Sequence, residues 1–393
     1  MRKLIFVWVI LLVFINSFVF AAGASTPGVY SNKIVIGTFQ ALSGPYAIIG
    51  RGMLKGMKAY FNWINKSGGV YGRKIDLIVY DDQLNPALTV TDVKRMVEQD
   101  HVFAIVGGLG TYGCLAVMNY LEKNHVPFVY QGSGSPLLSN PPKKYIFPVQ
   151  PNYDLEGHLI AKFLVKNEKK SKIAVMYMNN DIGLEGFSAV KDQLSKYNLK
   201  PLISIAYNPT NSDFSSEIIK LMNANPDSLV IYGLLTDTIR IITQLRQYGL
   251  DIPVVTIYPN ADPAFIKLGG KAVEGTILTG WVPIPTKNNP DFTKKFEKYI
   301  KIYQETYPKQ IPSSYAAAGF IAGEVFTHGL QLAGPHLTRD SLVKALDEFK
   351  NWNGILAQDI TFTPTEREGK TSMYFMKIEK GQFVPITGWM FLK

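Results

Sequence analysis

Three loops rich in glycine and hydroxyl side chains are the places where this chain could bind an anion. Ser43 lies in the first loop, Gly108–Gly113 forms the second, and Gly132–Ser135 forms the third. Glycine allows a ligand to approach bare backbone N–H groups, and a helix N-terminus presents such groups to negative charge. Because the hydroxyls of Ser43, Thr111 and Ser133 add hydrogen-bonding groups, these loops favour anion binding. A simple N-cap role is the alternative for Ser43.

Two patterns that would indicate an enzyme find no support in the neighbouring residues. Gly108–Gly113 has the G-x-G-x-x-G spacing of a dinucleotide site, but the next strand ends at Gln131, without the acidic residue that would hold a ribose. Asp81 and Asp82 could act as an acid–base pair, although a helix-entry and packing role fits them better. Since the sequence shows no clustered nucleophile and base, we expect neither catalysis nor a cofactor.

The elements that must position these loops alternate between short apolar runs and longer amphipathic segments. Strands separated by helices of about 10–15 residues indicate βαβ units and a parallel sheet. In such sheets ligands bind beyond the carboxyl ends of the strands, where the three loops would gather. The expected strands are residues 34–39, 74–80, 103–106 and 127–130 in one set, and 172–177, 201–206, 228–232, 253–257 and 275–280 in a second set.

The repeated set of strands divides the chain into two α/β lobes. Four prolines between residues 141 and 151 indicate a crossover between them. The last third differs, because long helices are followed by two strands around Lys380-Gly381, which predicts a β-hairpin. The expected helices are residues 47–65, 87–99, 113–123, 186–196, 212–223, 236–247, 291–307, 313–332 and 339–349, and the hairpin strands are 372–378 and 383–390.

Composition narrows the class of protein further. The chain has 393 residues, of which 47% are hydrophobic, and this is enough for two or three folded domains. One cysteine, Cys114, excludes a disulfide framework, and the five histidines lack the spacing typical of a metal site. The net charge of +10 is dispersed along the chain rather than concentrated in a stripe, so we expect no nucleic-acid partner.

The N-terminus has the pattern of a secretory signal. Arg2 and Lys3 precede an apolar run, residues 4–20, and small residues follow at 21–24. Cleavage in this small-residue stretch would make residues 1–24 a signal peptide. An uncleaved membrane anchor is the alternative, since the run is nearly long enough to span a bilayer. No cysteine follows the run to carry a bacterial lipid anchor, so we predict an exported, periplasmic or otherwise extracytoplasmic protein.

A series of short motifs, in a specific order and spacing, points to a known family. They are Ile36-Gly37-Thr38 with Leu42-Ser43-Gly44-Pro45, residues 64–74, Tyr80-Asp81-Asp82 with Asn85-Pro86, Ile105-Val106-Gly107-Gly108, Gly132-Ser133-Gly134-Ser135-Pro136, Asp181-Ile182-Gly183, Phe214-Ser215, Ala272-Val273-Glu274-Gly275-Thr276 and Tyr315-Ala316-Ala317. With these motifs, the chain from about Lys33 to its C-terminus resembles the type I periplasmic solute-binding proteins of ABC transporters, specifically the branched-chain amino-acid-binding family.

The resemblance implies an α/β fold of two doubly wound parallel-sheet lobes joined by three crossings, with the ligand held between them. It implies an N-terminal lobe of residues 31–149 plus 281–352 and a C-terminal lobe of residues 150–280 plus 353–393. It also implies a non-enzymatic component of an importer, which captures a small hydrophobic carboxylate by hinge closure and delivers it to ABC permease membrane subunits. Branched-chain amino acids are the family default, and service as a ligand sensor for a partner protein is an alternative.

The resemblance further implies which residues of the N-terminal lobe meet the ligand. Thr111, Gly132 and Gly134 match positions that bind the α-carboxylate and α-amino groups of an amino acid, and Ser43 lies at the edge of the cleft. Thr111 keeps the hydroxyl typical of the family, whereas Gly134 lacks it. The change at Gly134 removes one expected partner of an ammonium group.

The C-terminal lobe departs further from the family. Tyr258 stands where the family has the glutamate that holds the ammonium, while Ile182 and Leu235 replace tyrosines, as does Ile49 in the first lobe. A buried cation without a counter-charge is costly, so aromatic or aliphatic acids without an amino group are the rival ligands unless Asp181 or Asp237 supplies the charge. Three tyrosines could stack on an aromatic ligand. The expected ligand-binding residues are Ser43, Ile49, Thr111, Tyr112, Gly132, Ser133, Gly134, Tyr153, Asp181, Ile182, Leu235 and Tyr258.

Overall fold

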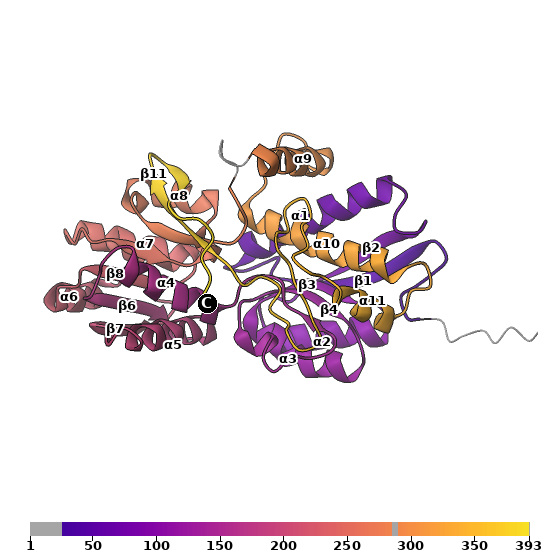
Figure 1. The fold of residues 1–393 in the computed structure, drawn as a ribbon, viewed down its shortest axis with the longest axis horizontal. Helices are drawn as coiled ribbons and strands as arrows, with labels where there is room; N and C mark the ends of the chain where they lie inside the picture. Colours follow the sequence, from indigo (N-terminus) through magenta and orange to yellow (C-terminus); the bar gives the residue numbers. More distant parts are fainter. Residues whose placement is uncertain (1–25, 285–289, 393) are drawn as a thin grey trace, which may run out of the picture.

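Two lobes lie side by side in the computed structural model, which describes residues 26–284 and 290–392 (Figure 1). The predicted signal peptide, residues 1–24, lies outside the described residues. The first lobe is built on a five-stranded parallel sheet with the order β2-β1-β3-β4-β5. Its strands are β1 Lys33–Gln40, β2 Lys74–Asp81, β3 Ile105–Leu109, β4 Phe128–Gly132 and β5 Ile146–Phe147.

Helices cover both faces of this sheet, as in a doubly wound fold. On one face, buried side chains of α1 and α10 pack with Ile36, Val106 and Val129. On the other face, side chains of α2 and α3 pack with Phe39 and Ile105. Successive side chains of a strand point to opposite faces of the sheet, so each strand contributes side chains to both packed layers. The helices of this lobe are α1 Ala47–Lys66, α2 Pro86–Glu98, α3 Thr111–Lys123, α9 Pro290–Thr306, α10 Ser314–Ala333 and α11 Arg339–Leu346.

The second lobe has a seven-stranded sheet with the order β12-β11-β10-β9-β8-β6-β7. Five of its strands are parallel, whereas β11 and β12, the predicted hairpin, run antiparallel along one edge. The second sheet is therefore dominated by parallel strands, with the predicted hairpin added at one edge, and the predicted α/β fold of two doubly wound lobes is confirmed. The strands are β6 Ile173–Met178, β7 Ile203–Tyr207, β8 Ser228–Tyr232, β9 Val254–Thr256, β10 Ile277–Gly280, β11 Tyr374–Glu379 and β12 Gln382–Pro385.

Five helices flank the second sheet, and two of them were not predicted. Helix α4 is buried along most of its length, and α8 is only seven residues long, so neither shows a clear amphipathic period. The helices are α4 Tyr153–Lys166, α5 Asp181–Ser195, α6 Ser215–Ala224, α7 Leu235–Gln247 and α8 Pro263–Gly269.

Three passages of the chain connect the lobes. The chain leaves the first sheet after β5, returns to the first lobe after β10, and crosses again after α11. In the last passage, residues 353–372 form an irregular strap that lies against the first lobe before β11 begins. The predicted boundary assigns this strap to the C-terminal lobe, and the exact lobe boundaries stay predictions.

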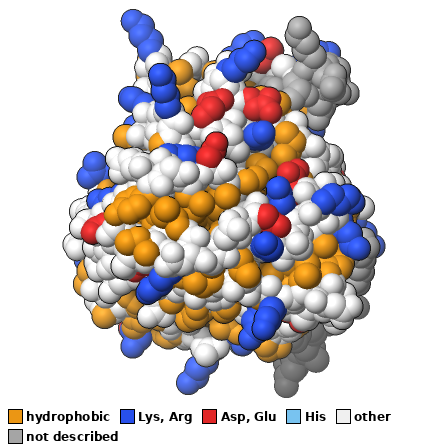
Figure 2. All heavy atoms as spheres, turned by 90° about the vertical axis from the view of Figure 1, so that its left-hand side faces the viewer, with side chains coloured by type: hydrophobic (Ala, Val, Ile, Leu, Met, Phe, Trp, Pro, Cys, Tyr) orange, Lys and Arg blue, Asp and Glu red, His pale blue; other side chains and the backbone are white. Residues whose placement is uncertain are grey.

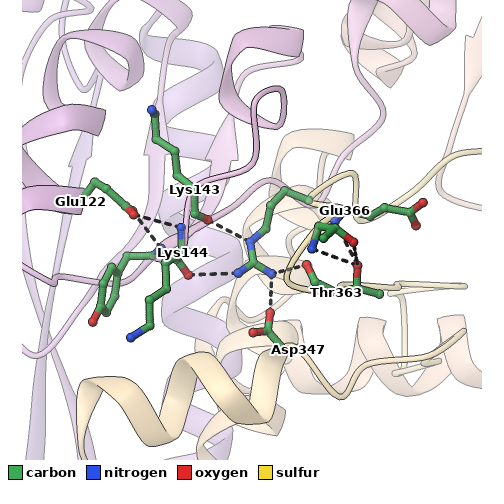
Figure 3. Close-up of polar contacts among 9 residues, drawn as sticks. Glu122, Lys143, Lys144, Asp347, Thr363 and Glu366 are labelled. Carbon is green, nitrogen blue, oxygen red and sulfur yellow. Dashed lines mark hydrogen bonds and ion pairs between the residues drawn. The ribbon is translucent and has the colours of Figure 1, made fainter.

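Two buried charged side chains hold the strap. The Arg367 guanidinium donates to the carbonyls of Lys143 (2.9 Å), Lys144 (3.1 Å) and Thr363 (2.6 Å), and it pairs with Asp347 (Figure 3). The Arg367 side chain is only 1% exposed. On α10, the Glu324 carboxylate accepts backbone N–H groups from residues 355–357, and burial raises its pKa to about 7. Glu324 of the first lobe is thus bonded by the strap, and Arg367 of the strap is bonded by Lys143, Lys144 and Asp347. Because these buried groups are satisfied only when the two segments pack together, the strap is part of the packed structure of the first lobe.

Candidate functional site

A cavity of about 810 Å³ lies between the two lobes. Both lobes line it, and so do α9 and the β11–β12 hairpin. Among the described residues that line it, only Asp82 and Lys267 carry a charge, and Lys267 is exposed. The wall is otherwise rich in aromatic and aliphatic side chains. Seven of the expected ligand-binding residues line the cavity: Ile49, Thr111, Tyr112, Gly132, Tyr153, Ile182 and Tyr258.

The first lobe presents the uncapped N-terminus of α3 to the cavity. Its N-cap is Gly110, whose φ of +103° suits glycine, and no side chain caps the helix. Gly110 to Gly113 all line the cavity, and the first N–H groups of a helix have no partner within the helix. No acidic residue lies in the first turn. This end of the cavity therefore offers free donors and the positive end of a helix dipole to an anion.

Hydroxyl groups surround this helix end. The Thr111 and Ser133 hydroxyls lie 2.8 Å apart, and the Ser135 backbone N–H donates to Ser133. Ser133 itself does not line the cavity but orients Thr111 from behind. Burial raises the pKa of Tyr153 to about 12, so its phenol is neutral and keeps a proton to donate. Thr111 and Tyr153 thus add side-chain donors to the backbone groups of α3.

The acidic residues near the first lobe are already engaged. Asp82 is buried, accepts the Thr89 hydroxyl at 2.6 Å and the Leu84 N–H at 3.1 Å, and burial raises its pKa. Asp81 accepts the Ser43 hydroxyl at 2.7 Å. Ser43 does not line the cavity, and its hydroxyl stabilises the loop after β1 instead. The pair of aspartates therefore serves loop and helix entry, as the sequence favoured.

Two aromatic rings pack at the positions where the sequence analysis expected the family's ammonium site. Rings of Tyr153 and Tyr258 stack with centroids 6.5 Å apart. A Cβ at Gly134 would lie 2.6 Å from the Tyr153 ring and 2.9 Å from the Tyr258 hydroxyl, so these rings require glycine there. The Tyr258 hydroxyl accepts from the Gln150 amide and donates to the Pro151 carbonyl. Gly134 lies behind the rings rather than in the cavity wall.

The nearest carboxylate to Tyr258 is used inside the second lobe. Glu156 on α4 accepts the Tyr258 backbone N–H at 2.9 Å and the hydroxyls of Thr279 and Tyr232. It is fully buried, and burial raises its pKa to about 7 despite these bonds. Glu156 does not line the cavity, so it does not replace the missing glutamate.

The second lobe presents Ile182 and Leu234 to the cavity. Leu235, the expected residue, is buried in the core of this lobe instead. Asp181 does not line the cavity, and its backbone N–H donates to the Tyr112 hydroxyl across the lobes at 3.3 Å. Asp237 lies in the first turn of α7, where burial raises its pKa to about 6.

Several residues that line the cavity were not predicted from the sequence. Trp281 follows β10, with its ring 6.5 Å from that of Tyr258, and Phe296 and Tyr299 come from α9. Tyr374 and Phe383 come from the C-terminal hairpin. Trp281 directly follows a strand, but the others are aromatic residues within a helix or a hairpin and carry no local sequence signal of a binding role. Residues so far apart in the chain meet only through the tertiary fold.

Other kinds of site find no support in the described part of the chain. No three His, Cys, Asp or Glu side chains among residues 26–284 and 290–392 are placed to hold a metal ion. On the end of the second lobe in Figure 2, Lys and Arg side chains are scattered among apolar and acidic ones rather than gathered in a stripe. Within the described residues, no helix combines the length and apolar character needed to cross a membrane.

Comparison with known proteins places this architecture in a family. A model of the periplasmic binding protein family matches residues 33–382. The Leu/Ile/Val-binding protein homolog 3 of Brucella melitensis is 25% identical over 371 residues, which cover 94% of this chain and 98% of that protein. The Leu/Ile/Val-binding protein BraC3 of Rhizobium johnstonii is 24% identical over 355 residues, covering 89% of this chain and 93% of that protein.

Solved structures share the fold at low sequence identity. A fatty acid ABC transporter substrate-binding protein from Thermomonospora curvata matches with a TM-score of 0.83 and 21% identity, over 94% of this chain and 95% of that one. A leucine binding protein from Thermotoga maritima matches with a TM-score of 0.79 and 22% identity, over 91% of this chain and 99% of that one. The chain therefore belongs to the periplasmic binding protein family.

Proposed function

We propose that this protein is the extracytoplasmic substrate-binding component of an ABC importer and that its ligand is a hydrophobic carboxylate without an amino group. One observation carries the proposal: an uncapped helix N-terminus faces an almost uncharged, aromatic-walled cavity. The α3 backbone N–H groups, Thr111 and Tyr153 would bind the carboxylate. Each helix-dipole contact contributes about 0.3–1 kcal/mol when exposed and up to ~2 kcal/mol when partly buried.

Ligand contacts to both lobes would drive closure of the lobes, which precedes delivery to the permease. Open and closed arrangements of two such lobes interconvert about their connections, and a ligand that touches both favours the closed one. Here the first lobe would hold the carboxylate, while Ile182, Leu234 and Tyr258 of the second lobe would close over the apolar part. The permease, or a partner protein if the chain serves as a sensor, would recognise the closed shape.

A branched-chain amino acid is the second candidate, because the curated relatives are named for Leu, Ile and Val. Against it stands the chemistry of the cavity wall. Asp82, the one carboxylate among the described lining residues, already accepts two hydrogen bonds, and Tyr258 occupies the position of the family's glutamate. An ammonium group would lose its hydration without gaining a free counter-charge.

Paired ligands separate the two candidates. The mature protein would be unfolded to release any bound ligand, refolded, and its thermal shift measured with leucine, isoleucine, valine and phenylalanine beside their deaminated analogues and benzoate. At about 1,000 times its Kd, a ligand stabilises the folded state by roughly 4 kcal/mol. We expect shifts with the acids lacking an amino group and none with the amino acids. A shift with leucine but not with 4-methylpentanoate would overturn the proposal.

A further inference from the structure

The cavity is several times larger than a branched-chain amino acid requires. A dry cavity of about 150 Å³ holds benzene, or roughly 25 Å³ for each heavy atom. On that scale the nine heavy atoms of leucine would occupy roughly 225 Å³, whereas the cavity measures about 810 Å³. A ligand of leucine size at the α3 N-terminus would leave most of this volume unfilled.

The unfilled part is an apolar chamber at a distance from the anion end. We call it the tail chamber and define it by Trp281, Val282, Phe296, Tyr374 and Phe383, all of which line the cavity. In Figure 1, α3 lies on the lower side of the molecule, while α9 and β11, which supply chamber residues, lie on the upper side. The rings of Tyr153, Tyr258 and Trp281 lead from one end to the other in steps of 6.5 Å.

The one hydroxyl among the five chamber residues, that of Tyr374, is paired within the protein. The buried hydroxyl of Tyr299, whose ring lies 5.6 Å from that of Phe296, has no hydrogen-bond partner in the described part of the chain. The Tyr374 hydroxyl donates to the Val282 carbonyl at 2.8 Å, and nearby Ser313 uses its side chain to cap α10. Trp281 and Tyr374 are buried, so their ring surfaces face the cavity rather than open solvent. A wall with so few polar groups favours an apolar chain over a second polar group of the ligand.

We infer that the ligand is elongated, a carboxylate whose apolar tail of about eight or more carbons fills the tail chamber. This inference rests on the proposed function, because it places the carboxylate at α3. It adds that Trp281, Val282 and Phe383 select for the length of the tail. Burial of each methylene is worth about 0.8 kcal/mol, which corresponds to about fourfold in affinity.

A chain-length series tests the inference on the stripped, refolded protein. The Kd values of butanoate, hexanoate, octanoate and decanoate would be measured by isothermal titration calorimetry. We expect the affinity to rise about fourfold per methylene up to octanoate or decanoate. If affinity stops rising at hexanoate, the chamber is not used and the inference is wrong, while the proposed function stands. If none of the acids binds, the proposed function fails and the inference with it.

Two variants locate the tail. Val282→Phe adds a ring to the chamber, so decanoate affinity should fall more than tenfold while hexanoate affinity changes less than twofold. Val97→Phe is the matched control, because Val97 is half-buried on α2 and does not line the cavity. Equal losses for both acids would contradict a separate tail chamber.

A fluorescence measurement covers the case in which Val282→Phe does not fold. Decanoate should change the tryptophan fluorescence of the parent protein, butanoate should not, and Trp281→Phe should abolish the decanoate response. An unchanged response in Trp281→Phe would place the tail elsewhere and overturn the inference.

Discussion

The two lobes share one architecture but differ in the first turns of the helices that begin after their strands. In the first lobe, α3 begins at Gly110 with no side-chain cap and no acidic residue in its first turn. In the second lobe, α5 is capped by the Asn180 side chain and carries Asp181 in its first turn, and α7 carries Asp237 there. An acidic residue in the first turn already satisfies a helix dipole and repels an anion. The start of α3 therefore favours an anion, whereas the starts of α5 and α7 do not.

This comparison teaches that a repeated βα unit can be specialised without changing its fold. The first lobe supplies donors, and the second supplies Ile182, Leu234 and Tyr258. An anionic head would bind the first lobe and an apolar tail would meet the second, so a carboxylate ligand is oriented before the lobes close. Substitutions at these helix starts, and in the strap that supports the first lobe, should therefore have different and measurable effects.

The largest expected effect concerns whether the first lobe keeps its shape. Arg367→Met leaves the Asp347 carboxylate and three backbone carbonyls without the buried guanidinium that they now contact. Removing one partner of a buried pair costs about 3–5 kcal/mol of unfolding free energy. Urea unfolding would measure the loss. Lys220→Met, at an exposed position of α6, is the control and should change stability by less than about 0.5 kcal/mol. Equal midpoints for the two variants would show that the strap contributes little.

A second prediction concerns the charge in the first turn of α3. Tyr112→Asp would place a carboxylate in its first turn, as α5 and α7 already have. Repulsion and a satisfied dipole together amount to about 2–3 kcal/mol, so carboxylate affinity should fall about 30- to 160-fold. Tyr112→Asn has the same size without the charge and should lose less than fivefold. Titration calorimetry would compare them, and similar losses in both would refute the role assigned to α3.

The smallest effect concerns Asp237 in the second lobe. Burial raises its pKa to about 6, partly offset by Arg240, above the value of about 3.9 expected in the unfolded chain. The folded protein therefore binds the proton more tightly, and its stability falls as the pH rises from about 4 through 6. Asp237→Asn removes this dependence. The melting temperature of the variant should therefore be higher than that of the parent at pH 7, and the two should be equal near pH 4.

Asp251→Asn provides the control for that pH profile. The Asp251 side chain is 93% exposed, so its substitution should give no difference that grows with pH. Thermal melts of the three proteins between pH 4 and 8 would check the expectation. A parent and an Asp237→Asn variant that melt in parallel across this range would contradict it. Carboxylate affinity should rise less than threefold in Asp237→Asn, because α7 meets the tail rather than the head.

Much of the scaffold could be predicted from local patterns. The strands of both sheets lie within a few residues of the apolar runs, because a buried strand is read from its own sequence. Strand β5 escaped because it has only two residues beside a proline. Helix α4 was not predicted because it is buried on most sides and includes the charged residue Glu156. The Glu156 carboxylate is bonded by residues of β8 and β10 and by Tyr258 in the turn after β9.

The residues of the site also fall into two groups, those that local sequence motifs predict and those that only the tertiary structure identifies. Thr111, Gly132, Tyr153 and Tyr258 could be chosen from motif positions, since each follows a strand end or begins a helix in a known order. That Tyr258 matches the family's glutamate stays a prediction, because it depends on how the chain is aligned with the family. Tertiary structure decided that Leu234 rather than Leu235 faces the cavity, and that Ser43 is occupied by Asp81. It also decided the size of the cavity, because its volume depends on how β10, α9 and the C-terminal hairpin, distant in sequence, pack together around one space.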